Sequence, residues 1–219
     1  LYTLPTNGGQ ALLVIGAVLM ASFVPIFSAR LTLEPVMILW INLFDSVFLT
    51  MPLMMEAKEP ELLKSPPRPR NKKLASRLLL QRVVVIGLTI ALPGFWIYHH
   101  FGAAAVAADG TILDEHLLSQ AQTAAFWAVL MVHDGFVMSA RSVHKSAFTF
   151  SPFSNKWLLA GIGASLALRL LPMLFPQIAS IFRMACFPAE WWLYILPCIL
   201  PGFIVLELEK VLRQRMRKA

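Results

Sequence analysis

The stretch ILWINLFDSVFLTMPL, residues 38–53, is apolar along most of its length but carries Asn42, Asp45 and Ser46 near its middle. A run of this kind is typical of a helix that crosses a lipid bilayer, which needs about 20 mostly apolar residues. An ionisable side chain at the bilayer centre costs at least about 2.5 kcal/mol, so it is retained where it meets a partner, water or an ion. The stretch therefore predicts a membrane helix with a functional carboxylate.

The whole chain has the composition of a membrane protein. Of its 219 residues, 58% are hydrophobic and 14% are charged, and the mean hydropathy is +0.67. Soluble domains hold about 45–50% apolar and roughly 25% charged residues. The net charge of +7 does not indicate nucleic-acid binding, because the basic residues lie between apolar runs and not on a hydrophilic domain. Cys186 and Cys198 have neither the spacing of a metal site nor a disulfide pattern.

Six apolar segments are long enough to span a bilayer, and no segment alternates with the period of two that a strand would have. A backbone in lipid satisfies its own hydrogen bonds, so we expect an all-α polytopic membrane protein, a bundle of six transmembrane helices. Because the chain begins with Leu and has no basic leader, we also expect a fragment that starts inside a helix. The predicted helices lie near residues 5–27, 34–55, 78–101, 119–140, 157–176 and 189–208.

Basic residues recur in alternate links between these helices. The Pro-rich link 56–76, the link after the fourth helix and the C-terminal tail are basic, whereas the loop between the third and fourth helices carries Asp109, Asp114 and Glu115. Basic loops stay on the cytoplasmic side of a membrane. We therefore expect both ends in the cytoplasm, residues 56–76 as an extended cytoplasmic loop, and a location in the plasma (inner) membrane.

Polar residues cluster on two of the predicted helices. Asn42, Asp45 and Ser46 follow the spacing i, i+3, i+4, which puts them on one helical face. Asn7 and Gln10 are spaced i, i+3 on the first helix. Carboxylate and amide oxygens are ligands of hard cations. Asn, Gln and Ser also form plain hydrogen bonds between membrane helices, and this alternative stays open for Asn7 and Gln10.

The fourth predicted helix contains two further candidates, His133 and Asp134. They are interpreted as cation ligands, as a proton relay, or as a structural pair with Arg169 on the fifth predicted helix. Arg169 is a potential ion-pair partner of Asp134 or of Asp45, and in that alternative the carboxylate is structural.

Residues 38–70, ILWINLFDSVFLTMPLMMEAKEPELLKSPPRPR, resemble the sixth membrane helix and the following cytoplasmic loop of P-type cation-transporting ATPases, especially the calcium-pump-like class. The shared features are LWINL, an acidic residue about a turn later, and EPELLKSPPR. The opening LPTNGGQALLVI, residues 4–15, resembles the fifth helix of that family. The resemblance covers essentially the whole chain as the fifth to tenth membrane helices and is strongest over residues 4–70.

The resemblance implies a role for each matching polar residue. Asn7 and Asn42 take the places of asparagines that give a side-chain oxygen to the cation. Gln10 stands where calcium pumps have an acidic ligand. Asp45 comes one residue before the usual sixth-helix aspartate, and Ser46 occupies that aspartate's place.

The resemblance also puts His133 near an acidic ligand of the eighth helix, with Asp134 beside it as the other candidate. Calcium pumps of this kind gather several carboxylates around two ions. In this chain Asp45 is the clear intramembrane carboxylate. The lower negative charge favours one divalent cation, a monovalent cation or protons.

The implied function is that of the C-terminal membrane domain of an ATP-driven cation pump, which forms part of the cation site and the helical scaffold. The chain has no DKTGT-type phosphorylation segment, so Mg-ATP is expected at upstream domains and this chain alone is not expected to be catalytic. The expected partners are the lipid bilayer, the transported cation and those upstream domains. Two alternatives are a secondary ion transporter or channel, and a non-transporting membrane scaffold subunit in which Asp45 pairs with Arg169.

Overall fold

The computed structural model describes residues 3–56, 77–142, 146–149 and 151–218, with all of their side chains except those of residues 45, 46, 77, 78, 152 and 216–218. Within these ranges the chain forms helices joined by short turns and contains no β-strand. Apart from Glu56, the predicted cytoplasmic loop 56–76 lies outside the described residues.

Six helical segments in the described part of the chain are long and apolar enough to cross a membrane, which confirms the predicted all-α bundle. The first, third, fourth and fifth are α1 (Thr3–Met20), α5 (Arg77–Gly102), α6 (Glu115–Ala140) and α7 (Lys156–Leu174). The second consists of α3 (Pro35–Phe44), the π-helical segment Asp45–Thr50 and α4 (Met51–Met54). The sixth runs through α9 (Trp192–Ile195) and α10 (Ile199–Lys218).

Two helices end earlier than their predicted ranges, and in each case a proline begins the next helix. The first was expected to reach residue 27, but α1 ends at Met20, and Val24 is extended before α2 (Pro25–Ala29). The fifth was expected to reach residue 176, but α7 ends at Leu174, and Phe175 is extended before α8 (Pro176–Phe182). A proline ring disfavours the helical conformation of the residue before it. Apolar residues continue through both breaks, so hydropathy alone did not predict them.

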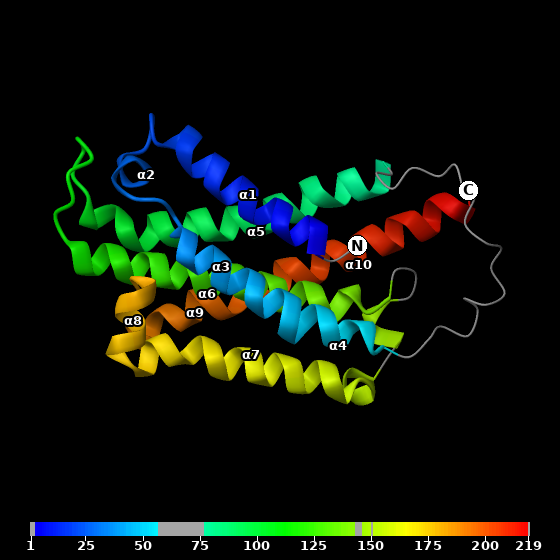
Figure 1. The fold of residues 1–219 in the computed structure, drawn as a ribbon. Coiled ribbons are helices and arrows are strands. Elements are labelled where there is room, and N and C mark those ends of the chain that lie inside the picture. Colours follow the sequence, from blue (N-terminus) through cyan, green and yellow to red (C-terminus); the bar gives the residue numbers. More distant parts are fainter. Residues whose placement is uncertain (1–2, 57–76, 143–145, 150, 219) are drawn as a thin grey trace.

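The spans lie side by side and alternate in direction (Figure 1). The connections 21–34, 103–114 and 175–188 gather at one end of the bundle, on the left in Figure 1, and the end of α4, the start of α5 and the end of α10 lie at the other. We call these the connection end and the basic end. Helix α6 runs through the interior, where α5 and α10 both contact it, and α1 packs along α5. Nearly all of α6 from Ala121 to Val137 is buried.

Helices α6 and α10 touch through their backbones. A Cβ atom added at Gly135 would lie 2.0 Å from the carbonyl oxygen of Ile199, and one added at Gly202 would lie 2.1 Å from the carbonyl oxygen of Val132. No side chain fits at either position. Small residues of this kind let membrane helices approach closely and gain van der Waals contact, and here they fix α10 against the central helix.

At the basic end, the end of α4 is tied to the start of α7. Arg141 donates to both carboxylate oxygens of Glu56, at 2.6 and 3.0 Å. The amide of Asn155 donates to Glu56 Oε2 at 2.9 Å and to the carbonyl of Pro52 at 3.0 Å. The Oδ1 atom of the same Asn155 accepts from the N–H of Leu158 and so caps α7. These contacts fix the second span relative to α7.

The Glu56 contacts predict an acid-sensitive stability. Burial of Glu56 opposes its charge, but the hydrogen bonds from Arg141 and Asn155 outweigh this effect and hold the pKa of the carboxyl below its ordinary value of 4.5. A group with a lowered pKa in the folded state stabilises the fold above its ordinary pKa and loses this effect as the pH falls through that range. We expect Glu56→Gln to lower the unfolding temperature at pH 7, and the difference from the unaltered protein to shrink below about pH 4.5.

Thermal unfolding of the purified protein in detergent, scanned over pH, measures this difference. Glu190→Gln, a change at an exposed carboxylate near the connection end, is the control and should leave the profile unchanged. A gap between Glu56→Gln and the unaltered protein that stays constant with pH would contradict the assignment.

Candidate cation site in the membrane

The second span changes its helical geometry at the residues that the sequence singles out. α3 ends at Phe44, and the next six residues, Asp45–Thr50, are π-helical before α4 resumes at Met51. π-Helical turns inside α-helices are rare and occur frequently at functional sites. Pro52 lacks an N–H group, so it cannot donate to the carbonyl of Phe48 four residues earlier. The carbonyl of Phe48 therefore lacks the donor that it would have in a regular α-helix.

Helix α7 lies directly against this interruption. A Cβ atom at Gly161 would lie 2.1 Å from the carbonyl oxygen of Phe48 and 3.0 Å from Cγ of Pro52. The bare backbone of α7 therefore contacts the π-helical segment. Helix α1 contacts the same segment from elsewhere in the bundle, so the residues around Asp45 are held between helices rather than facing lipid alone.

The three predicted amide ligands, Asn7, Gln10 and Asn42, lie in different environments. Asn42 is half-buried, and its Oδ1 atom is buried with no hydrogen-bond donor among the described residues. Gln10 is 3% exposed, and its Nε2 atom finds no acceptor within the described ranges. Asn7 lies on the exposed side of α1. The side chains of Asp45 and Ser46 lie outside the described set.

A buried polar atom without a hydrogen bond costs about 1–3 kcal/mol, so it calls for an explanation such as a bound ion or water. The Asn42 oxygen suits a cation, because amide oxygens bind hard cations. Gln10 presents a donor in this structure, so it favours a polar neighbour rather than a cation at that atom. Of the amides in the predicted site, Asn42 therefore has the geometry that best fits a ligand.

His133 and Asp134 are buried inside α6, and Asp134 forms an ion pair with Arg169 of α7. Arg169 Nη1 donates to Asp134 Oδ2 at 2.6 Å, and the Arg169 side chain is fully buried. Its guanidinium carbon also lies 5.4 Å from the ring centre of Phe44, the residue before Asp45. The structure thus shows Arg169 paired with Asp134, one of its two predicted partners. The side chain of the other, Asp45, lies outside the described set. The roles of His133 and Asp134 as ligands stay predictions.

Sequence reasoning missed two parts of this site. The π-helical geometry had one signal, Pro52, because a proline removes a helical donor. The contact made by Gly161 could not be predicted from the sequence, because it depends on which helix packs beside this glycine.

These features define a polytopic membrane domain with polar and charged groups at bilayer depth, the class that carries ions or small solutes. A family model described as "Cation transporting ATPase, C-terminus" matches residues 30–212. This match covers most of the chain, so the chain belongs to that family and is a C-terminal domain of a P-type ATPase. The predicted resemblance is confirmed.

Curated relatives agree with this assignment. The chain is 27% identical over 194 residues to "Probable cation-transporting ATPase F" of Mycobacterium tuberculosis, covering 89% of this chain and 20% of that protein. It is 29% identical over 209 residues to "Calcium-transporting ATPase" of Bacillus subtilis, covering 93% and 21%. It is 26% identical over 206 residues to "Cation-transporting ATPase pma1" of Synechocystis, covering 91% and 21%. The chain thus spans about a fifth of the length of these relatives.

The contact between α7 and the interrupted span can be tested with a matched pair of glycines. Gly161→Ala forces a methyl group into the Phe48 carbonyl, and overpacking of this kind costs about 1–3 kcal/mol. Gly163, two residues along the same helix, has no atom within 4 Å of an added Cβ. Alanine is better than glycine in a helix by about 1 kcal/mol, so Gly163→Ala should unfold at the same or a higher temperature. Equal unfolding temperatures for the two variants would refute the contact.

The Asp134–Arg169 pair predicts strong coupling. Replacing one member of a buried ion pair costs about 3–5 kcal/mol, because the remaining charge loses its partner. Asp134→Asn and Arg169→Gln should each lower stability, and the double variant should lose much less than the sum of the two. Asp134→Asn combined with Glu115→Gln, at the far end of α6, is the control and should be additive. Additivity in the first pair, measured by denaturation in detergent, would show that the ion pair is not the stabilising interaction.

Proposed function

We propose that this chain is the membrane part of an ATP-driven cation pump and supplies part of its intramembrane cation site. The proposed ligands are Asn42, Asp45 and Ser46 on the interrupted second span. Asn7 and Gln10 of α1 stay predicted ligands, and their environments favour a cation less than that of Asn42 does. The observation that carries the proposal is the π-helical break that begins at Asp45, in a span held between α1 and α7. The names of the relatives, cation- and calcium-transporting ATPases, support the same function.

The charge balance inside the bundle favours few ions. Arg169 compensates the charge of Asp134, because both side chains are buried and their atoms are 2.6 Å apart. This pair adds no net charge to the site. Among the proposed ligands Asp45 then remains as the carboxylate for the cation, which favours one divalent cation, a monovalent cation or a proton over two divalent cations.

The proposed transport mechanism is alternating access. The α6–α10 backbone contact gives a fixed frame. The interrupted span and α1 are the elements whose geometry changes with ion occupancy. Mg-ATP binding and phosphorylation belong to the remaining domains of the parent pump, and these domains are the proposed partners of this chain. ATP hydrolysis there would drive the change in the ion site.

In the proposed orientation the basic end faces the cytoplasm. The proposed location of the pump is the plasma membrane. Arg82, Arg141 and Arg213 all belong to helix ends on that side of the bundle, and Asp109 lies in the connection at the opposite side. Basic residues are retained on the cytoplasmic side during insertion. This distribution supports the proposal that both chain ends face the cytoplasm.

The decisive experiment uses the full-length protein that contains this chain, reconstituted in vesicles and supplied with ATP. Uptake and ATPase activity are scanned across Ca²⁺, Mg²⁺, Mn²⁺, Na⁺, K⁺ and pH. We expect one cation to stimulate ATPase activity and Asp45→Asn to abolish this stimulation. Asn42→Ala should raise the half-saturating concentration of the cation by about tenfold, the equivalent of about 1.4 kcal/mol of lost binding.

Asp109→Asn, at an exposed loop carboxylate, is the control and should transport normally. Unaltered transport by Asp45→Asn, with an unchanged unfolding temperature, would remove Asp45 from the site. Cation flux that continues without ATP would instead support a channel or a secondary transporter.

A further inference from the structure

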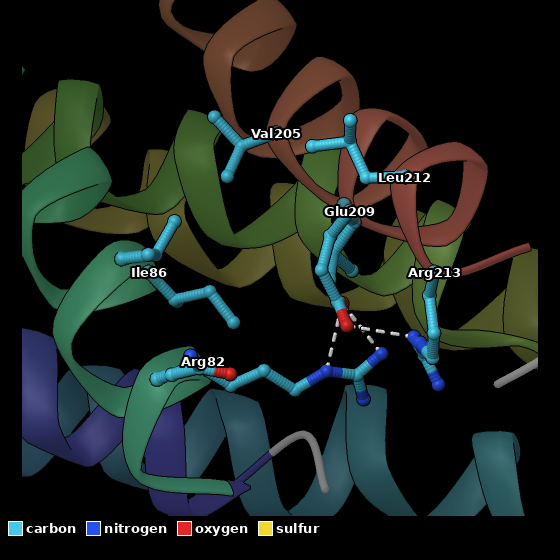
Figure 2. A pocket seen from close by; sticks show the side chains of 9 residues that line it. Arg82, Ile86, Val205, Glu209, Leu212 and Arg213 are labelled. Carbon is cyan, nitrogen blue, oxygen red and sulfur yellow. Dashed lines mark hydrogen bonds and ion pairs between the residues drawn. The ribbon is translucent and has the colours of Figure 1, made fainter. Parts of the chain in front are cut away.

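A groove lies between α5 and α10 near the basic end of the bundle, with a cavity volume of about 160 Å³ (Figure 2). Its walls are mainly apolar and include Val85, Ile86, Val205 and Leu212. Val85 and Leu212 are 46% and 59% exposed, and both helices belong to membrane spans. The groove therefore lies on the outer surface of this bundle and not in its interior.

The end of the groove is charged. Arg82 donates to Glu209 Oε2 through Nε at 2.8 Å, and its Nη2 atom lies 2.7 Å from the same oxygen. Arg213 donates to Glu209 Oε1 at 2.7 Å. Figure 2 shows the two guanidinium groups on either side of this carboxylate. Two cations and one anion leave a net charge of +1 at the end of an apolar groove.

Among the described side chains, the neighbouring charged groups leave this positive excess in place. Arg215 is exposed and follows Leu212 by three residues, so it extends the basic surface on the same face of α10. On another side of α10, Glu207 and Lys210 pair with each other at 2.8 Å and contact α6 through the carbonyl of Ser139. The groove therefore has an excess of positive charge.

The position of the cluster matches the level of lipid headgroups. Arg82 lies one turn inside the span that begins at Leu79, and Arg213 lies two residues before the end of the span that finishes at Arg215. Arginine forms strong hydrogen bonds with phosphate oxygens, often as a bidentate pair. Basic pockets between membrane helices bind the headgroups of anionic lipids.

We propose that this groove binds one anionic phospholipid, with its phosphate at Arg213 and the exposed Arg215 and one acyl chain along Val85, Val205 and Leu212. The net positive charge selects an anionic lipid over a zwitterionic one. Bound lipid would join α5 to α10 from outside, and this inference does not depend on which cation the pump carries.

The test measures lipid retention by the full-length protein in native mass spectrometry, with phosphatidylglycerol and phosphatidylcholine of identical acyl chains as the probes. We expect retention of one phosphatidylglycerol and little phosphatidylcholine. A basic side chain near anionic lipid is worth about 1 kcal/mol, which is roughly a fivefold change in affinity. Arg213→Gln should therefore weaken retention of phosphatidylglycerol about fivefold.

Two further variants separate binding from folding. Val205→Phe fills the apolar part of the groove and keeps its charges, so it should also reduce retention of phosphatidylglycerol. Lys156→Gln removes one exposed positive charge at the same end of the bundle but outside the groove, so it is the matched control and should retain the lipid. Unfolding temperatures with and without phosphatidylglycerol identify any variant that has simply lost its fold.

Several outcomes would overturn the proposal. Equal retention of the two lipids would remove the selectivity for charge, and equal loss in Arg213→Gln and Lys156→Gln would point to general surface attraction. Stabilisation by soluble glycerol phosphate to the same extent as by phosphatidylglycerol would mean that a free phosphate compound is the ligand. A co-purified membrane peptide that blocks lipid retention would make the groove a protein interface.

Discussion

A backbone within the bilayer core has no water to bond with, and this constraint governs the whole bundle. Helices satisfy it along the described spans, but the second span changes from α-helical to π-helical hydrogen bonding at residues Asp45–Thr50. π-Helical turns are rare and occur frequently at functional sites, and here protein surrounds the segment. The packing of α7 through Gly161, and of α1 from another side, provides these surroundings. The interruption and its neighbours therefore form one unit.

The Asp134–Arg169 pair has a second effect on this unit. An unpaired carboxylate buried near the proposed cation site would add negative charge, and the ion pair of Asp134 with Arg169 neutralises this charge. Arg169 also lies over the ring of Phe44, so its position is coupled to the helix that leads into the interruption. Arg169 of α7 therefore contacts both Asp134 of α6 and Phe44 of α3.

Much of the fold followed from hydropathy, because each span is an apolar run of bilayer length and loop composition marks its ends. The breaks before Pro25 and Pro176 did not, because apolar residues continue through them. The ion pair between Arg169 and Asp134 also needed the structure, since sequence spacing does not show which side chains of different helices meet. The π-helical geometry and the Gly161 contact depend on tertiary packing that a linear pattern does not encode. The ligand assignments rest on sequence and on the environment of Asn42.

The burial of α6 has a consequence for how the protein enters the membrane. This helix contains Gln122, Thr123, His133, Asp134 and Ser139, all buried by neighbouring helices. Each such side chain is costly in lipid but acceptable inside protein. On its own, during synthesis, α6 would therefore be a poor membrane segment, and it gains a favourable environment only as α5, and later α7 and α10, pack around it. Among the described spans, α6 is the most buried by its neighbours, which matches the number of polar side chains that it carries.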